Sequence, residues 1–234
     1  LGGSATLDGY GTSLAANGRF HSQALQGDAY AQTSSFNDNL SGGLNLESTL
    51  ALGAGKLAMG GQNLPLDAGL IIDVESDLQG VKLRANDGQG MSAMLHPGRN
   101  IVPVTAFKSG HVRFDFDAKD MPPAQIQPLA VDYHLNRGGV GYHAVKVMRT
   151  VTVFGRLLDG HGQPLQGAHV INDAGRTVVE VDGYFSVEMS EARPTLEIRH
   201  GTAGSCLLTL PPDNFDRDDD LLIVGDQRCV PRMG

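Results

Sequence analysis

The chain has 234 residues, of which 31 are glycine and none is tryptophan. Because glycine costs about 1 kcal/mol relative to alanine inside a helix, this composition argues against a helical protein. Eighteen basic and 26 acidic residues leave a net charge of −8 with no basic run, which argues against nucleic-acid binding. A stretch of about 20 apolar residues is missing, so the sequence excludes a transmembrane helix but not membrane-spanning strands.

The first region, residues 1–65, is rich in glycine, serine, alanine and asparagine. Its clearest two-residue alternation runs from Leu40 to Leu52, with leucines at even positions and small or polar residues at most odd positions. This pattern predicts a strand whose two faces meet different surroundings. Alternating segments of about ten residues joined by turns are typical of an outer-membrane β-barrel. An amphipathic strand of a soluble sandwich gives the same alternation, and both interpretations stay open on this pattern.

The second region, residues 66–149, predicts a β-sandwich. An apolar run at Ala68–Val74 has the length of a buried strand, and residues 111–117 alternate cleanly. Turn dipeptides such as Pro97-Gly98 separate six or seven short strands at intervals of about 8–12 residues.

The third region, residues 150–234, predicts a second and smaller β-sandwich. A strand is expected from Val151, followed by a tight turn at 159–162. Asp182-Gly183, between two alternating segments, predicts a β-hairpin, because an Asp-Gly pair suits a two-residue turn.

The two cysteines, Cys206 and Cys229, lie 23 residues apart in this third region. One disulfide bridge is favoured over two free thiols, and it would add about 3 kcal/mol on the chain-entropy model. A zinc site is the weaker interpretation, because His200 is the one histidine near them. The bridge would place the region in an oxidising compartment.

Motifs of catalysis are missing from the sequence, which has no nucleophile elbow, P-loop or zinc-protease motif. The eight histidines are scattered singly. His161 and His169 flank one expected hairpin, where exposed turn histidines are commoner than metal ligands. We therefore expect no enzyme, no catalytic or metal-binding residues, no cofactor and no small-molecule substrate.

An acidic stretch, Asp213–Asp220, invites a calcium hypothesis because carboxylates on one loop attract hard cations. Its spacing lacks the central glycine and closing glutamate of an EF-hand loop. A solvated acidic loop is favoured over a calcium site.

Several segments taken in order resemble a known family. Residues 155–170 and 181–187 resemble the carboxypeptidase-regulatory-like sandwich, and this stretch includes the hairpin segment Pro164-Leu165-Gln166-Gly167-Ala168. The segments that precede and surround them extend the resemblance: Ala68–Val74, Pro97–Val104, Asn136–Val140, Gly167–Asn172 and the late cysteine pair. In this order they resemble the C-terminal part of a fimbrial outer-membrane usher of the alternate (alpha) class, over nearly the whole chain.

The resemblance implies an all-β chain of three parts. Residues 1–65 would be the terminal strands of a transmembrane β-barrel, 66–149 a first C-terminal β-sandwich, and 150–234 a second one holding the Cys206–Cys229 bridge. The barrel would lie in the outer membrane and the two sandwiches in the periplasm. The implied partners are a periplasmic chaperone and pilus subunits, which are held while subunits cross the pore and polymerise, with no cofactor. The resemblance carries over no individual partner-binding residues.

Two further expectations follow. The sequence begins Leu1-Gly2-Gly3 without an initiator methionine, so we expect a piece of a larger protein. Three or four barrel strands cannot close into a barrel by themselves, so residues 1–62 would need the remaining strands.

The alternative function is a secreted β-sandwich adhesin or carbohydrate-binding module. The lack of tryptophan and the aromatic content of 6 % count against it, since glycan readers use aromatic platforms.

Overall fold

The computed structural model describes residues 2–8, 11–22, 24–35, 39–61, 67–88, 90–117, 121–201 and 204–230. Within these ranges the chain is built from β-strands, together with one short 3-10 helix, Pro212–Asn214. No helix in the described part of the chain is long and apolar enough to cross a membrane. The predicted all-β fold class is confirmed.

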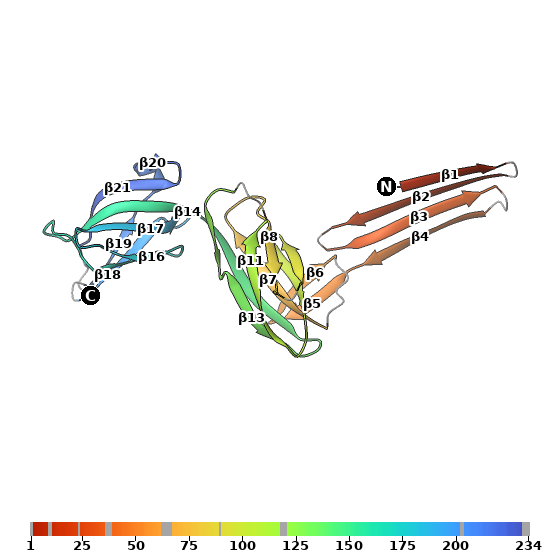
Figure 1. The fold of residues 1–234 in the computed structure, drawn as a ribbon, viewed down its shortest axis with the longest axis horizontal. Coiled ribbons are helices and arrows are strands. Elements are labelled where there is room, and N and C mark those ends of the chain that lie inside the picture. The colour runs from red at the N-terminus through yellow and green to blue at the C-terminus, as the bar shows by residue number, and fades with distance from the viewer. Residues whose placement is uncertain are drawn as a thin grey trace. The chain divides into compact units, whose positions relative to one another are not determined.

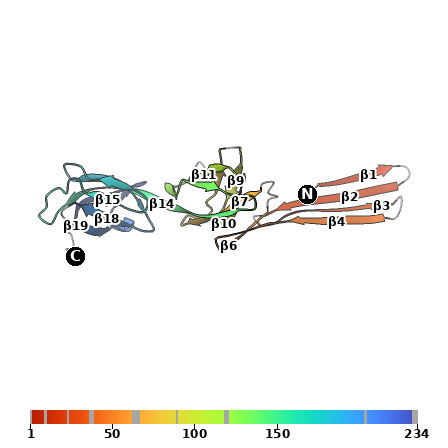
Figure 2. The same cartoon turned by 90° about the horizontal axis from the view of Figure 1, so that it is seen from below.

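The N-terminal strands form one antiparallel sheet in the order β1-β2-β3-β4. Their bounds are β1 (Gly2–Asp8), β2 (Gly11–His21), β3 (Gln26–Ser34) and β4 (Asn39–Glu47). Figure 1 shows these four strands side by side in red to orange, and Figure 2 shows them as a single layer. Each inner strand therefore presents one row of side chains on each side of the sheet.

The expected single strand from Leu40 to Leu52 is two strands in the structure. β4 ends at Glu47, and β5 (Thr49–Gly53) begins after Ser48 and pairs with β6 (Lys56–Gly60) in a separate hairpin. The Ser48 hydroxyl donates a hydrogen bond of 2.8 Å to the carbonyl of Ala24. This bond ties the break to the turn between β2 and β3.

The β5–β6 hairpin has the backbone of a tight two-residue turn. Ala54 and Gly55 both have positive φ, 49° and 70°, between the paired residues Gly53 and Lys56. Two successive residues of positive φ match the right-handed twist of hairpin strands, and glycine adopts this conformation without strain. The hairpin is thus a defined element.

The chain folds into two compact units. The first comprises residues 1–74, 82–115 and 130–144, and the second residues 75–81, 116–129 and 145–234. Strand β14 (Val140–Leu158) is a single strand of 19 residues that contributes to both. The expected boundaries at 65 and 149 remain predictions.

The first unit contains a sandwich beside the N-terminal sheet. One layer is formed by β7 (Ala68–Ser76), β10 (Gly98–Val104) and the start of β14; the other runs in the order β13-β11-β8-β9. The strands of that second layer are β8 (Leu83–Asn86), β9 (Ser92–Leu95), β11 (Ser109–Phe116) and β13 (Ala130–His134). Leu70, Leu83 and Phe114 are fully buried in its core.

The second unit is a sandwich of two sheets around one core. In one sheet, β17 (Tyr184–Ser190) and β21 (Leu221–Arg228) flank β14, and the short β12 (Ala124–Gln127) and β20 (Asp216–Asp218) extend it. The other sheet has the order β16-β15-β18-β19. Its strands are β15 (His169–Ile171), β16 (Arg176–Val178), β18 (Thr195–His200) and β19 (Gly204–Thr209). Val153, Phe185 and Leu196 pack in the shared core.

The Asp182-Gly183 turn is present, but the predicted hairpin around it is wrong. Gly183 has a φ of 92° and its N–H donates to the carbonyl of Glu180. Strand β16 before the turn pairs with β15, whereas β17 after it pairs with β14 in the opposite sheet. The turn chemistry fixes a local reversal, while Phe185 and Val187 of β17 are buried in the core and the residues of β16 are exposed or half-buried.

Candidate functional site

The N-terminal sheet has two chemically different faces, and its register defines them. Residues directly opposite each other on neighbouring strands project to the same side. Ala16 pairs with Ala31, and Ala31 with Gly42, whereas Arg19 pairs with Asp28, and Asp28 with Asn45. Every second residue of β2, β3 and β4 therefore belongs to one of two surfaces, named here the apolar face and the polar face.

The apolar face carries no charged side chain over β2, β3 and β4. Its large residues are exposed: Leu40 is 76 % exposed, Leu44 61 % and Leu46 54 %. The remaining members are small or apolar apart from two threonines: Thr12, Leu14, Ala16, Gly18, Phe20, Gly27, Ala29, Ala31, Thr33 and Gly42. Such a surface is costly in water, because each square ångström of apolar area left exposed forfeits about 25 cal/mol.

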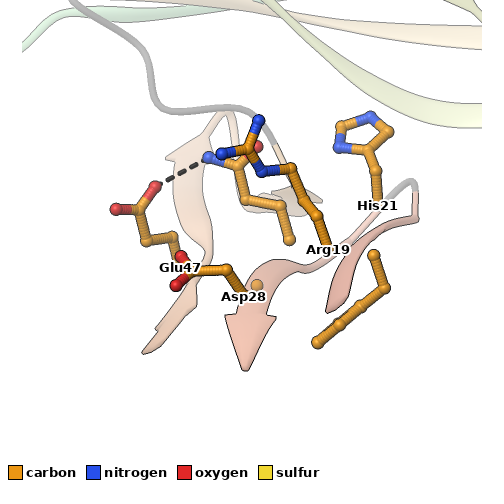
Figure 3. Close-up of a pocket in the computed structure, with 7 residues that line it drawn as sticks. Arg19, His21, Asp28 and Glu47 are labelled. Atoms are coloured by element: carbon orange, nitrogen blue, oxygen red, sulfur yellow. Dashed lines mark hydrogen bonds between the residues drawn. The ribbon is translucent and has the colours of Figure 1, made fainter. Parts of the chain in front are cut away.

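The polar face carries the charged and amide groups of the same strands. Near the β2–β3 turn, the Asn45 amide donates to the Asp28 carboxylate at 3.1 Å and the Gln26 amide to Glu47 at 2.7 Å. Figure 3 shows Arg19, His21, Asp28 and Glu47 around this end of the sheet, with the bond to Glu47 dashed. A hollow of about 460 Å³ lies among them. At this end of the polar face, side-chain hydrogen bonds therefore join β3 and β4.

Two glycines let aromatic rings lie flat on the sheet. A Cβ on Gly43 would fall 2.5 Å from the Tyr30 ring on the polar face. A Cβ on Gly27 would fall 2.7 Å from the Phe20 ring on the apolar face. The glycine content of this region thus has a packing role, because each ring covers backbone that a side chain would otherwise shield.

A single-layer sheet with one uncharged apolar face and one polar face is typical of a barrel wall that separates lipid from water. Strands of outer-membrane barrels alternate in this way, with apolar residues toward lipid and polar residues toward the lumen. In a soluble sandwich, the leucine rows would instead be covered by a second sheet. The exposure of the leucines therefore favours the first of the two interpretations that the alternation left open.

The two cysteines of the second unit form the expected disulfide. Cys206 lies in β19 and Cys229 directly follows β21, so the bond between them joins the two sheets of the sandwich. Cys229 is 2 % exposed and belongs to the core. The link closes a chain separation of 23 residues.

The turn after β14 is held by one carboxylate. Asp159 accepts hydrogen bonds of 2.8 Å from the backbone N–H groups of His161 and Gln163. These bonds, led by the one from Gln163, lower the pKa of Asp159 below its ordinary value of 3.8. The turn allows Leu158 to pair with Pro164, so the Pro164–Ala168 segment begins directly after the turn.

The histidines and acidic residues considered as metal ligands do not form a cluster in the described part of the chain. His161 lies exposed in the 159–163 turn, and His169 is exposed at the start of β15. The acidic stretch forms the 3-10 helix and β20, where the Arg217 guanidinium donates to Glu191 at 2.8 Å. Among the residues that the structure describes, no three histidine, cysteine or acidic side chains gather closely enough to hold a metal ion.

Two features were missed by sequence reasoning. One is the polar cluster of Arg19, Asp28 and Asn45, which only the strand register brings together. The other is the β5–β6 hairpin, although Ala54-Gly55 between two alternating segments was a visible turn signal.

Comparison with known proteins gives a consistent relationship. The family CooC_C, described as CS1-pili formation C-terminal, matches residues 135–230. The chain is 26 % identical over 231 residues to the probable outer membrane usher protein EcpC of Escherichia coli, in strains O127:H6, O18:K1:H7 and O6:H1. The match covers 88 % of this chain and 25 % of each relative, so the chain spans about a quarter of the length of these ushers.

A solved structure shares the fold. A chain of the E. coli P pilus tip assembly intermediate PapC-PapD-PapK-PapG superposes with a TM-score of 0.58 at 17 % identity. The superposition covers 98 % of this chain and 28 % of that one. The pilus-formation family and the usher relatives confirm the resemblance seen in the sequence: the chain is similar to the C-terminal region of outer-membrane ushers, and the P pilus structure shares its fold.

Proposed function

We propose that residues 1–65 supply the terminal strands of an outer-membrane pore, and that residues 66–149 and 150–234 form two periplasmic domains acting in pilus assembly. The observation that carries the proposal is the sheet with one exposed, uncharged apolar face and one polar face. The apolar face lies against lipid and the polar face lines the pore. The remaining strands of the barrel pair with the free edges of β1 and β4.

The two domains hold complexes of a periplasmic chaperone with pilus subunits during translocation and polymerisation. Support comes from the relatives, which are ushers, and from the P pilus assembly intermediate, which brings PapC together with PapD, PapK and PapG. The Cys206–Cys229 bridge fits the oxidising periplasm. The role is assembly without bond-making chemistry by this chain, so no cofactor takes part.

A pair of neighbouring substitutions tests the placement of the sheet. Leu44→Arg puts a charge on the apolar face, which costs about 2–4 kcal/mol near the middle of a bilayer. Asn45→Arg puts the same charge on the polar face, one residue away. In the full-length usher, we expect Leu44→Arg to abolish the folded, heat-modifiable protein in the outer membrane and Asn45→Arg to leave it. Equal tolerance of both substitutions would contradict the lipid-facing assignment.

A truncation tests the assembly role. An usher that ends before Thr150 keeps its barrel strands and loses most of the second unit. We expect normal amounts of the truncated protein in the outer membrane but no pili on the cell surface, measured by fractionation and electron microscopy. Normal piliation would rule out a role for the last domain in assembly.

A further inference from the structure

The β5–β6 hairpin also has two different faces. Its large apolar side chains are exposed and its alanines are buried, which is the opposite of the arrangement that water favours. Leu50 pairs with Met59 and Leu52 with Leu57, so these four large residues share one face. Leu50, Met59, Leu52 and Leu57 are 63 %, 48 %, 68 % and 46 % exposed, in that order. The small residues Ala51 and Ala58 form the other face and are only 7 % and 3 % exposed.

The buried face of the hairpin is packed against the first sandwich. Ala51 and Ala58 form a small core with Ile71, against which Ile101, Val140 and Tyr142 also pack. In water, burial of leucines would release more free energy than burial of alanines, since the gain follows the apolar area removed. The sequence places the alanines inward, so the outward leucine face is built for surroundings other than water.

The hairpin is fixed in this orientation. The Arg99 guanidinium donates to the backbone carbonyl of Leu57 at 3.1 Å, and the Lys56 ammonium lies 6.0 Å from the centre of the Tyr142 ring. A Cβ on Gly53 would fall 2.8 Å from the Val140 side chain, so the hairpin backbone lies directly on β14. The leucines cannot turn inward unless these contacts break.

The leucine spacing of the apolar face of β4 continues past the break at Ser48 into the exposed face of the hairpin. Leu44 and Leu46 in β4 and Leu50 and Leu52 in β5 all occupy even positions, and Ser48 is the one even position between the two pairs. Because strand side chains alternate with a period of two, even positions stay on one side of an extended chain.

The length of chain is right for the edge of a bilayer. Six residues separate Leu46 from Leu52, which at about 3.3 Å each is about 20 Å of strand. At a barrel tilt of about 40°, this covers about 15 Å along the membrane normal. Since the headgroup region on each side of the hydrocarbon layer is several ångströms thick, Leu52 would lie in the headgroup layer when Leu46 lies several ångströms inside the hydrocarbon edge.

We propose that the face formed by Leu50, Leu52, Leu57 and Met59 inserts into the headgroup region of the membrane leaflet on the periplasmic side of the barrel. The inference rests on the proposed function, because it needs β4 to lie in the barrel wall. The apolar side chains of this face enter the boundary between the headgroups and the acyl chains. The hairpin thus attaches the first periplasmic domain to the membrane surface as well as to the barrel.

Site-directed fluorescence in the full-length usher tests this placement. Single cysteines replace Leu52 or Met59, each carries an environment-sensitive NBD label, and the protein is reconstituted into phosphatidylethanolamine–phosphatidylglycerol vesicles. Phospholipids with a doxyl quencher near the headgroup are then added. We expect strong quenching at both positions. Leu44→Cys, on the apolar face of β4, is the positive control, and Val181→Cys, 73 % exposed in the second unit, is the negative control.

Each outcome decides the question. Quenching at positions 52, 59 and 44 but not 181 supports the inference. Labels at 52 and 59 that stay unquenched while 44 is quenched overturn it: a water-like emission means an open face, and a blue-shifted one means that protein covers it. A label at 44 that escapes quenching overturns the proposed function itself, and this inference with it.

Discussion

The N-terminal sheet and the C-terminal sandwich use the same two-residue alternation but treat their apolar residues in opposite ways. Leu40 in β4 is 76 % exposed, whereas Leu196 in β18 is fully buried in the sandwich core. The sandwich supplies its own apolar surroundings through a second sheet, and the N-terminal sheet has only one layer. Alternation therefore shows that the two faces of a strand meet different environments, but it does not identify those environments. For the apolar face of the N-terminal sheet, we propose that the environment is lipid.

The largest expected difference comes from deleting one leucine side chain in each region. Leu196→Ala removes buried methyl groups from a closed core, and such changes cost about 2–5 kcal/mol. Leu40→Ala removes a side chain that would face lipid and leaves no cavity in the protein, so we expect a smaller loss of about 1–2 kcal/mol. Urea unfolding of the full-length usher in vesicles, followed by pulse proteolysis of each region, measures both. Similar losses of unfolding free energy for Leu196→Ala and Leu40→Ala would contradict the proposed difference between the two regions.

The disulfide gives the next largest effect, and only in the second unit. Replacing Cys206 and Cys229 together with alanine should lower the free energy of unfolding of that unit by about 3 kcal/mol, because the unfolded chain regains the freedom of a closed loop. The same proteolysis assay reads the result. The N-terminal sheet serves as the internal control and should keep its resistance, since no cysteine lies there. A loss shared by both regions would indicate that they unfold as one body.

The smallest expected effect is a pH dependence confined to the turn after β14. The pKa of Asp159 is lower folded than unfolded, because its carboxylate accepts backbone hydrogen bonds. Its stabilising contribution is therefore complete above the ordinary value of 3.8 and is lost as the pH falls through the folded pKa. Asp159→Asn should lower the stability of the second unit at pH 7, and the difference from the unsubstituted protein should shrink below about pH 3.8.

Sequence reasoning reached the strands and the chemistry of their faces because both depend on local alternation. It also anticipated the bridge between Cys206 and Cys229, since two cysteines allow one pairing. It failed where the pairing partner of a strand lies far away in the sequence. Asp182-Gly183 signals a turn, but it does not identify β15 and β14, the strands with which β16 and β17 pair.

The break at Ser48 was missed for a different reason. Leucines occupy even positions on both sides of Ser48, so the alternation that predicted the strand gave no sign that β4 ends at Glu47. The polar cluster of Arg19, Asp28 and Asn45 could not be assembled without the register, because its members lie 9 and 17 positions apart along the chain.

Strand β14 has a consequence for how such chains can change in evolution. Val145, Val147, Val151 and Val153, all in the second unit's part of this strand, are buried and occupy odd positions, so one phase of side chains is buried there. A single inserted or deleted residue near position 148 would turn every later side chain to the wrong side. Exchange of the last domain between related proteins must therefore change the count of residues along this strand only by an even number, or move the junction out of it.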